Sequence, residues 1–250
     1  MARRREDVKI TIVMPGFNAG RTLERTVSAI PPGWADDLLL VDDSSTDDTV
    51  EVARRLPLRV VWHPHNVGYG GNQKTCYLDA LQHDADIVVM LHPDGQYEPT
   101  LIPALVEPIL RGEADLVLGS RLARPGMALE GGMPMYKYVA NRFLTTVENA
   151  VMGTHLTDLH TGYRAYSREL LLTVPFLRNS LDFAFDSEML MQAAYFGFRL
   201  AEVPAKSIYF DDASSITFGP ATIYGLKTLG VAATLVLHRL HIVRSALFTR

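Results

Sequence analysis

The chain has 250 residues, of which 48% are hydrophobic, 21% charged and 9% aromatic. This composition is typical of a globular chain with a large core, so it excludes intrinsic disorder, collagen-like repeats and a disulfide scaffold. The 24 basic and 28 acidic side chains give a formal net charge of -4, which supplies no general positive field, so nucleic acid is not an expected partner. The single cysteine, Cys76, excludes an internal disulfide and fits a reducing compartment, so we expect a cytoplasmic protein.

No segment is predicted to cross a membrane or to act as a secretory signal. The basic start of the chain reaches Pro15 without a long apolar stretch and predicts a frayed end before a first strand. The most apolar later stretch covers only residues 229–237, well short of the roughly 20 residues that span a bilayer.

Short runs of branched apolar residues alternate with segments of helical period in the first half of the chain. The runs are typical of strands buried on both faces, and they cover residues 8–14, 37–41, 58–62, 85–91 and 114–119. The segments of helical period cover residues 21–30, 46–56, 72–82 and 100–110. This alternation predicts an α/β fold with a Rossmann-like, mostly parallel sheet and helices on both faces.

The pattern changes in the second half. Residues 120–134 are rich in Arg, Gly, Met and Pro and show neither period, which predicts a mobile loop. Helices are predicted over residues 135–152 and 186–196, and strands over residues 162–166 and 199–203. We expect one domain over the whole chain, with its last third forming a lobe built onto the sheet.

The C-terminal segment from residue 220 shows near-heptad apolar spacing. The residues at this spacing are Ile223, Leu226, Gly230, Ala233, Leu237 and Leu240. The pattern predicts a helix that packs on the domain or on a second copy of the chain, and a helix lying on a membrane surface stays open as an alternative. A homo-oligomer and a peripheral membrane contact are therefore both considered.

Polar residues follow the ends of the predicted strands, which share one edge in a doubly wound sheet. After the first strand, Gly16 allows close backbone approach and Asn18 offers both a donor and an acceptor, although a turn with a helix cap explains the same residues. After the second strand, Asp42 and Asp43 are placed to accept hydrogen bonds from a nucleobase or a ribose. The next helix is expected to begin with a capping box between Ser45 and Asp48.

A glycine-rich turn over residues 66–74 follows the third strand. Such a turn exposes backbone N–H groups to a phosphate, and Lys74 adds positive charge nearby. Gly68 and Gly70 are followed by Gln73 rather than by a third glycine, so the dinucleotide-binding fingerprint fails and a dehydrogenase is disfavoured.

The fourth strand leads into His92, Asp94 and Gln96 at alternating positions. The two oxygen-bearing side chains suit Mg2+ or Mn2+, whereas His92 suits Mn2+ better than Mg2+. Arg121 follows the fifth strand and is placed to meet an anion at the same edge. Each motif alone has an ordinary structural explanation, a polar turn or a solvated charge. Together they predict a site for a nucleoside diphosphate and a metal ion.

The order of these motifs resembles the family-2 glycosyltransferases of GT-A fold, and in particular their polyprenyl-phosphate branch, which includes dolichol-phosphate mannose synthase. The matching segments are IVMPGFNAG, LLLVDDSSTDDT, HNVGYGGNQK, VVMLHPDGQYEP, LVLGSR, TDLHTGYRAYSREL and FDSEMLMQAAYFGFRLAEVP. Two positions depart from the family pattern. His92 stands where the first acid of a D-x-D element is usual, and residues 211–216 replace a basic Ser-Lys element.

The resemblance implies that residues 1–119 bind a GDP- or UDP-sugar and that residues 120–250 form the acceptor side. The residues expected to hold the nucleotide sugar are Pro15, Phe17, Asn18, Asp42, Asp43, Gly68, Lys74, His92 and Asp94. The residues expected to hold Mg2+ or Mn2+ are Asp94, Gln96 and His92, and Arg121 and Arg164 are expected to meet the acceptor, with pairing to Asp158 as the alternative for Arg164.

The implied reaction is the inverting transfer of a hexosyl group to a polyprenyl phosphate, with Asp94 and Arg121 among the catalytic residues. A soluble hydroxyl acceptor is the alternative, and it needs a base, for which Asp186 and Glu188 come first and Asp158 third. A noncatalytic nucleotide-sugar-binding domain and a sugar nucleotidyltransferase are the alternatives of other classes. His155, His160, His238 and His241 are assigned structural or surface roles. Met127, Met133 and Met135 are candidates for lining an apolar acceptor groove.

Overall fold

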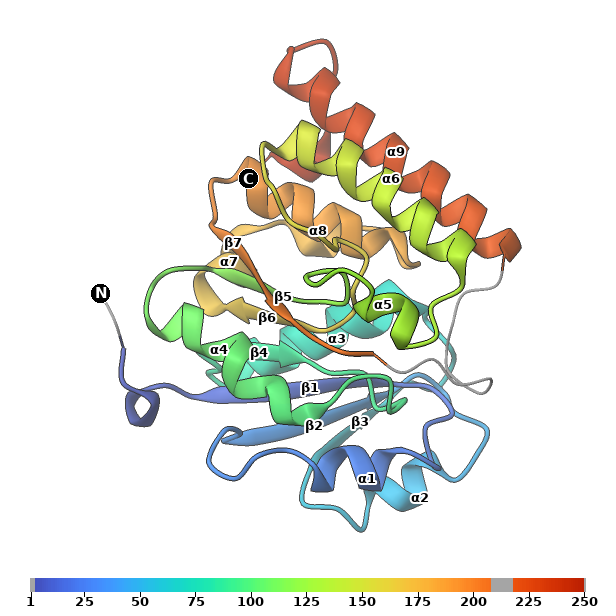
Figure 1. The fold of residues 1–250 in the computed structure, drawn as a ribbon. Helices are drawn as coiled ribbons and strands as arrows, with labels where there is room; N and C mark the ends of the chain where they lie inside the picture. The colour runs from blue at the N-terminus through green and yellow to red at the C-terminus, as the bar shows by residue number, and fades with distance from the viewer. Residues whose placement is uncertain (1–2, 208–217, 250) are drawn as a thin grey trace.

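The computed structural model describes residues 3–207 and 218–249, with only the backbone of Phe218 and Pro220 (Figure 1). Seven strands form one sheet in the order β3-β2-β1-β4-β6-β5-β7. Their bounds are β1 Ile10–Gly16, β2 Asp37–Asp42, β3 Arg59–Trp62, β4 Ile87–Met90, β5 Leu116–Ser120, β6 Arg164–Ser167 and β7 Leu200–Pro204. β6 alone pairs antiparallel, with β4 and β5, so the prediction of a mostly parallel α/β sheet is confirmed.

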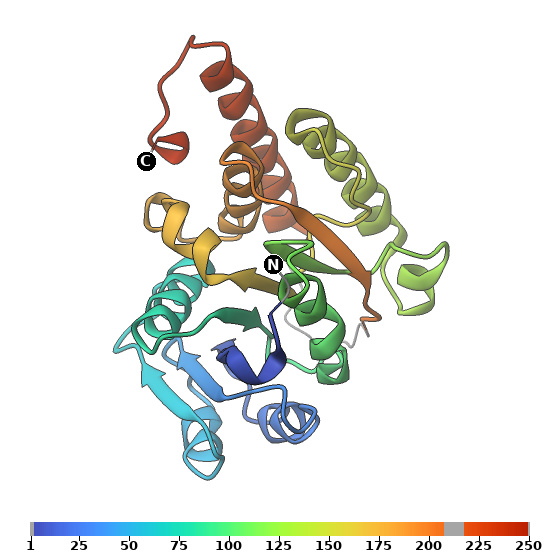
Figure 2. The same ribbon diagram turned by 90° about the vertical axis from the view of Figure 1, so that its left-hand side faces the viewer.

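Helices cover both faces of this sheet (Figures 1 and 2). The bounds of those on one face are α1 Leu23–Ser28, α2 Thr49–Ala53 and α4 Ile102–Leu110. The bounds of those that contribute to the core on the other face are α3 Tyr69–Gln82, α6 Met135–Met152, α7 Arg168–Thr173, α8 Ala184–Tyr195 and α9 Phe218–Arg239. The short helix α5, Met127–Glu130, lies between β5 and α6.

The continuous apolar runs in the sequence are explained by burial on both faces. In β1 every residue is buried: Ile12 and Met14 pack with α1 and α4, whereas Val13 packs on the opposite side with α3. Successive side chains of a strand point to opposite faces, so a central strand covered on both sides needs apolar residues at every position. The strand predictions are therefore correct to within two residues at each end.

The second half of the chain contributes to the same sheet as the first half. β6 lies between β4 and β5, and β7 pairs parallel with β5 at the edge. The expected lobe is thus built from α6, α8 and α9 on one face, while its strands extend the existing sheet (Figure 1). Three strand pairings, β4 with β6, β5 with β6 and β5 with β7, join the two halves.

Residues 120–134 contain more structure than their lack of period predicts. Besides α5, they include Leu122, Ala128 and Met133, which form a small buried cluster. Met127 is also buried, whereas Met135 is 60% exposed, and none of the three methionines lines the cavity described below. Met127 and Met133 pack within this segment, whereas Met135 is exposed at the start of α6.

The C-terminal helix α9 is longer and more apolar than the sequence estimate. Its stretch Ala221–Arg239 has a mean hydropathy of 1.2 and is long enough to cross a membrane, so the estimate from residues 229–237 was too short. Length and composition alone do not separate a spanning helix from one packed in a domain. Val231, Ala232 and Leu235 are buried against the core, and α9 lies alongside α6 and α8 (Figure 1). Residues 211–216, where a departure from the family pattern was noted, lie outside the described residues.

Candidate active site

A cavity of about 930 Å³ lies at the carboxyl edge of the sheet. It opens where the strand order reverses, because β1 pairs with β2 on one side and with β4 on the other. The predicted site residues that line it are Pro15, Phe17, Asn18, Asp43, His92, Asp94, Gln96, Arg121 and Asp186. The strand exits thus converge on one space, as the sequence predicts.

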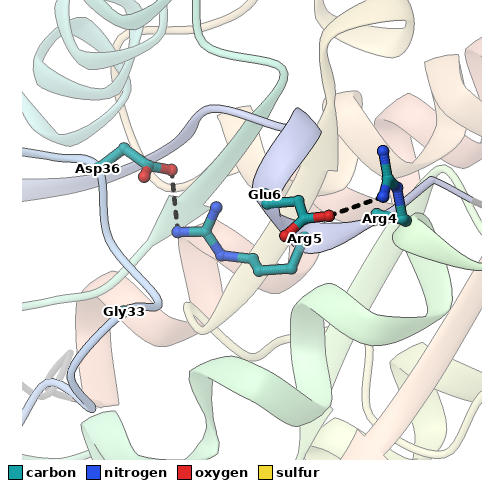
Figure 3. A pocket seen from close by; sticks show the side chains of 5 residues that line it. All are labelled: Arg4, Arg5, Glu6, Gly33 and Asp36. Carbon is teal, nitrogen blue, oxygen red and sulfur yellow. Dashed lines mark ion pairs between the residues drawn. The ribbon is translucent and has the colours of Figure 1, made fainter.

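A second hollow lies at the opposite, amino-terminal edge (Figure 3). It is lined by Arg4, Arg5, Glu6, Gly33 and Asp36. Arg5 pairs with Asp36 at 2.9 Å and Arg4 pairs with Glu6 at 2.9 Å, so its charges are matched within the protein (Figure 3). This hollow offers an incoming ligand few uncompensated groups, and the cavity at the carboxyl edge is the candidate active site.

The exit of β1 is tied to the loop after β2. Asn18 has a left-handed backbone with φ of 53°, and its Oδ1 accepts a hydrogen bond from Thr46 N at 2.8 Å. Its own N–H donates to Ser45 Oγ at 2.8 Å. Asparagine adopts this backbone conformation more readily than most residues, which suits the position. Phe17 is 53% exposed, so its ring is available to a ligand in the cavity.

The two acids after β2 have different environments. Asp42 is fully buried and accepts hydrogen bonds from Ser45 N at 3.0 Å and Ser45 Oγ at 2.5 Å. It does not line the cavity, so the expectation that it contacts the nucleoside is not met. Asp43 does line the cavity, and one of its oxygens accepts from Val67 N at 2.8 Å. His63 Nδ1 lies 3.0 Å from the same oxygen, which fixes the carboxylate.

The predicted capping box before α2 is wrong. Ser45 Oγ is engaged by Asp42, and the side chain of Asp48 makes no capping hydrogen bond. Instead, Asp47 accepts hydrogen bonds from Thr49 N at 3.0 Å and from Gly20 N at 3.0 Å. The loop therefore uses its acids to join two strand exits rather than to cap one helix.

The glycines of the glycine-rich turn pack against protein rather than facing the cavity. Gly68 has φ of 84°, and its N–H donates to Asp43 Oδ2 at 3.1 Å. Gly70 N donates to Leu181 O at 2.8 Å, and a Cβ on Gly70 would lie 2.4 Å from Ser180 O. These glycines permit close backbone approach to the segment before α8, which accounts for them without a phosphate.

Lys74 is directed away from the predicted phosphate. Its Nζ donates a hydrogen bond to Asn179 O, and burial lowers the pKa of its ammonium group. Neither Lys74 nor Gly68 lines the cavity. Lys74 lies on the face of α3 that packs against the segment before α8, and its helix position alone could not reveal this.

The exit of β4 places His92, Asp94 and Gln96 together. Asp94 Oδ1 accepts a hydrogen bond from Gln96 N at 3.0 Å across Gly95, whose φ of 75° forms a turn. The extended geometry expected after β4 is therefore absent, yet all three side chains line the cavity. The ring of His92 stacks on Tyr69 with centroids 5.6 Å apart, and His92 Nε2 lies 3.4 Å from the Tyr69 hydroxyl.

Arg121 is held in place by a buried acid. Its Nε lies 2.6 Å from Asp158 Oδ2, and its Nη2 donates to Asp158 Oδ1 at 2.9 Å and to His160 O at 2.8 Å. Asp158 thus pairs with Arg121 and not with Arg164. Lys137 of α6 lines the same cavity, where burial and the Arg121 guanidinium lower its pKa. Two cations consequently face one space.

Asp186 and Arg164 form a buried pair under the cavity. Asp186 accepts hydrogen bonds from the Tyr69 hydroxyl at 2.8 Å and from Gln73 Nε2 at 3.2 Å, and Arg164 Nη1 lies 3.5 Å from its Oδ1. Arg164 is fully buried and donates to the carbonyls of Thr161, Leu159 and Asp186. It does not line the cavity, so its expected contact with an acceptor phosphate is not met.

Glu188 also lies away from the cavity. Its carboxylate accepts hydrogen bonds from Ser180 N at 2.6 Å and Ser180 Oγ at 2.8 Å. Burial raises the pKa of Glu188, and the Ser180 hydrogen bonds partly oppose this. The residue holds the segment before α8, so its expected role as a base is not met.

Several residues that line the cavity were missed in the sequence. They are Arg21, Thr22, Arg25, Asn66, Tyr69, Asn72, Tyr97, Lys137, His160, Gly162, Phe183 and Tyr224. Lys137 and Tyr224 lie on helices that the sequence marked only by their apolar period, and His160 was assigned a structural or surface role. Lys137 and Tyr224 offered no signal because they approach the strand exits from distant helices, whereas Asn66, Tyr69 and Tyr97 lie within motifs that the sequence had already marked.

The fold and this cavity define a sugar-transferring α/β enzyme of GT-A type, a class to which a solved structure points. Glucosyl-3-phosphoglycerate synthase from Mycobacterium tuberculosis, solved with Mn2+, UDP-glucose and phosphoglyceric acid, has a TM-score of 0.66 at 25% identity. The match covers 96% of this chain and 82% of that chain.

The sequence comparisons identify the family. Residues 11–174 match the model of Glycosyl transferase family 2, and the chain belongs to this family. A UDP-N-acetylglucosamine–dolichyl-phosphate N-acetylglucosaminyltransferase of Methanococcus voltae is 27% identical over 238 residues, 88% of this chain and 93% of the relative. An undecaprenyl-phosphate mannosyltransferase of Micrococcus luteus is 27% identical over 204 residues, 79% of this chain and 82% of the relative. The predicted family and enzyme class are confirmed.

Proposed function

We propose that this glycosyltransferase transfers a hexosyl group from a UDP- or GDP-sugar to a polyprenyl phosphate, with inversion at the anomeric carbon. The observation that carries the proposal is one cavity lined by acidic strand exits and by the cations Arg121 and Lys137. A nucleoside diphosphate sugar and an anionic acceptor both fit that lining. The relatives that act on dolichyl phosphate and undecaprenyl phosphate support the acceptor class.

The donor is bound by the exits of β1 and β2. Asp43 is held by the Val67 N–H and by His63, so its carboxylate is already oriented when a base or ribose arrives. Pro15, Phe17 and Asn18 complete this part of the lining. Because its orientation is already fixed, the Asp43 carboxylate loses little entropy when the nucleotide sugar binds, which favours a specific contact.

The ligand atoms at the exit of β4 suit Mg2+ or Mn2+ when the nucleotide sugar is bound. Asp94 and Gln96 offer a carboxylate and an amide oxygen, and His92 adds a nitrogen that favours Mn2+. Within residues 3–207 and 218–249 no group of three or more His, Cys, Asp or Glu gathers to hold a metal ion. Mg2+ is commonly held by one or two carboxylates together with substrate phosphates. Bound there, the ion supplies positive charge to the leaving diphosphate.

The acceptor phosphate is bound by Arg121 and Lys137. Arg121 is fixed by Asp158, and Lys137 is a partly buried cation whose pKa is lowered by burial and by the Arg121 charge. A phosphate between them would relieve their repulsion and accept several charge-assisted hydrogen bonds. The ionised acceptor oxygen then attacks the anomeric carbon on the side opposite the diphosphate, and the electron pair of the broken bond leaves with the nucleoside diphosphate.

The apolar surface beside the cavity suits an acceptor held in a membrane. We define the α6–α9 face by its exposed apolar residues: Met135, Tyr136, Val139, Phe143, Ile223, Leu226, Leu237 and Leu240. Lys137 and Tyr224 of the cavity belong to the same two helices. The only acid of α6 and of residues 218–249 is Glu148, which is buried, whereas Arg142, Lys227, Arg239 and Arg244 are exposed.

This surface supports a peripheral position at the cytoplasmic side of a membrane. Lys227 pairs with Asp182, but Arg142, Arg239 and Arg244 add further positive charge. Exposed apolar residues with an excess of cations are typical of a helix that lies on an anionic membrane surface. Because one side of α9 is buried against α6 and α8, the helix would lie on the membrane rather than cross it. A second copy of the chain is the competing occupant of the same face.

A soluble acceptor with a hydroxyl group is the second candidate. The solved synthase from Mycobacterium tuberculosis binds phosphoglyceric acid beside UDP-glucose, so this fold also accommodates a small anionic acceptor. Of the three acids predicted as a base, only Asp186 lines the cavity, since Glu188 binds Ser180 and Asp158 binds Arg121.

Calorimetric titration with UDP- and GDP-sugars in the presence of Mn2+ tests the donor. We expect saturable binding of one nucleotide class, and folded protein that binds neither would remove the proposal. Product analysis with the bound sugar, supplied either with undecaprenyl phosphate or with phosphoglyceric acid, tests the acceptor. A glycosyl phospholipid product supports the first candidate, and a soluble glycoside alone supports the second.

A further inference from the structure

A buried carboxylate lies in contact with an imidazole at the wall of the cavity. Glu148 of α6 is fully buried, and its Oε2 lies 3.1 Å from Nε2 of His160. Neither carboxylate oxygen of Glu148 accepts an aligned hydrogen bond from any residue in the described ranges. Nε2 of His160 likewise has no aligned hydrogen-bond partner among the described residues, so the Glu148 carboxylate is the acceptor within reach of a proton on Nε2.

The other nitrogen of the same imidazole meets a hydroxyl that lines the cavity. Nδ1 of His160 lies 2.6 Å from the Tyr224 hydroxyl, and Tyr224 of α9 is part of the cavity wall. Ser187 Oγ lies 3.4 Å from the same hydroxyl. Burial, reinforced by Glu148, raises the pKa of Tyr224, so its phenol keeps its proton at neutral pH.

These contacts set the direction in which a proton can move. With Nε2 protonated toward Glu148, the neutral imidazole presents the lone pair of Nδ1 to the Tyr224 O–H. The order carboxylate, imidazole, hydroxyl is the one that lets a hydroxyl give up a proton while the carboxylate stabilises the imidazolium formed. Here the hydroxyl is a phenol at the cavity wall, so it can exchange that proton with a bound molecule.

We propose that Glu148, His160 and Tyr224 form a relay that removes the proton from the acceptor oxygen. The proposal rests on the proposed function and adds the fate of that proton. The acceptor P–OH gives its proton to the Tyr224 oxygen while the Tyr224 proton moves to Nδ1 of His160. The acceptor oxygen bonds to the anomeric carbon as the bond from that carbon to the donor diphosphate breaks. Tyr224 is the catalytic residue, and His160 and Glu148 are positioning residues.

The chemistry of the acceptor explains why a relay is useful. A phosphate monoester loses its second proton with a pKa of about 6, so part of the acceptor is still protonated near neutral pH. The relay would make that fraction reactive. At alkaline pH the acceptor is a dianion without help, and the relay then contributes nothing to its ionisation.

Other charged groups around the relay are engaged with one another. Arg121 donates to His160 O and pairs with Asp158, whose Oδ1 accepts from His160 N at 3.2 Å. Asp186 and Arg164 form the pair beneath Tyr224. Of the five charged residues Arg121, Asp158, Arg164, Asp186 and Glu148, only Glu148 contacts the His160 imidazole with its side chain. Replacing Glu148 therefore tests the relay without breaking the other two ion pairs.

The test compares transfer rates to undecaprenyl phosphate between pH 5.5 and pH 9. We expect Tyr224→Phe to lower kcat about fourfold at pH 5.5, where about three quarters of a monoester with a second pKa of about 6 is still protonated, and to leave kcat nearly unchanged at pH 9. Glu148→Gln keeps the volume but removes the charge, so it should lower kcat about twofold at pH 5.5 with little change in KM and little change in kcat at pH 9. Two control variants should leave the profile unchanged: His155→Asn at an exposed histidine, and Tyr195→Phe, whose hydroxyl meets His238 outside the cavity.

Two results would overturn the relay. The first is wild-type kcat in Tyr224→Phe, and the second is an equal loss at every pH, which indicates a structural role. Wild-type enzyme that transfers only to a hydroxyl acceptor would refute the proposed acceptor instead, and the relay would then predict a loss in Tyr224→Phe that persists at pH 9. Nitrogen-15 NMR of the histidines provides a readout without turnover: a neutral His160 ring protonated on Nδ1 excludes the relay in every case.

Discussion

Arg121 and Asp158 form a two-point ion pair in which Nε lies 2.6 Å from Oδ2 and Nη2 lies 2.9 Å from Oδ1. Asp158 is fully buried, and Asn141 donates a further hydrogen bond to its Oδ1 at 2.9 Å. The pair joins the end of β5 to the segment before β6 and aims the guanidinium at the cavity. The stability of this part of the fold and the proposed binding of the acceptor are therefore expected to depend on the same contact.

Asp158→Asn should destabilise the protein by about 3 to 5 kcal/mol, because it leaves the Arg121 guanidinium without its counter-charge. Burial opposes ionisation of Asp158, but Arg121 and the hydrogen bonds outweigh it and hold the pKa of Asp158 well below its usual range. A depressed pKa stabilises the fold above the unfolded value of about 3.9 and loses that contribution as the pH falls below it. Urea unfolding at pH 7 and pH 3 measures both effects.

The control for this variant is Glu6→Gln, which breaks the exposed pair with Arg4 (Figure 3). It should leave the free energy of unfolding at pH 7 unchanged, since exposed pairs contribute little. A variant at Asp158 as stable as the wild type would show that the pair does not hold this part of the fold.

Asp94→Ala should lower transfer by about 100-fold or more while leaving the fold intact, because it removes the only carboxylate proposed to hold the metal ion at the leaving diphosphate. Circular dichroism checks the fold, and the rate is measured over a range of Mn2+ concentrations. Glu51→Ala, at an exposed acid of α2, is the matched control. Turnover preserved in the Asp94 variant would refute the metal assignment.

Lys137→Ala should raise KM for a phosphate acceptor about 10- to 100-fold, since a hydrogen bond to a charged group contributes about 1.5 to 3 kcal/mol. Burial and Arg121 lower the pKa of Lys137, so the wild-type enzyme should lose acceptor affinity as the pH rises through that lowered value. The variant should lack this alkaline loss. Steady-state kinetics from pH 7 to pH 10 measure it, with Arg111→Ala, at an exposed residue just after α4, as control.

Phe143→Asp should weaken binding to vesicles containing anionic lipid about tenfold or more, because it places a charge on the exposed apolar α6–α9 face. Vesicle flotation measures the bound fraction. Trp62→Asp changes an equally exposed aromatic residue on β3, far along the chain from that face, and should leave binding unchanged. The wild type could instead fail to bind vesicles and sediment as a dimer. If Phe143→Asp dissociates that dimer, the face is an interface between two copies.

Individual residues show which features of the structure could be predicted from the sequence. Val13 and Met14 belong to an unbroken apolar run, and such a run has one common explanation, a strand covered on both faces. Asp43, Asp94 and Gln96 follow such strands directly, so the parallel sheet alone brings them to one edge. These predictions needed only local pattern and the rule that parallel strands end together.

Other residues depended on contacts that no local pattern encodes. Lys74 and Glu188 occupy helix starts that look functional, yet Lys74 binds Asn179 O and Glu188 binds Ser180. Lys137 and Tyr224 sit on helices whose sequence shows only an apolar period, yet they reach the cavity. The rotation of a helix about its axis decides which of its residues face a site, and that rotation is set by packing against distant segments.

The sequence by itself determined the α/β class, the edge at which the polar exits meet and the family to which the chain belongs. Tertiary structure alone decided that Asp42 is buried while Asp43 faces the cavity, and that His160 joins Glu148 to Tyr224. The physical reason is the separation along the chain between the residues that interact. Strand burial and turn chemistry act between near neighbours in the chain, whereas the contact of α6 with α9 joins segments whose relay residues stand 76 positions apart (Glu148 to Tyr224).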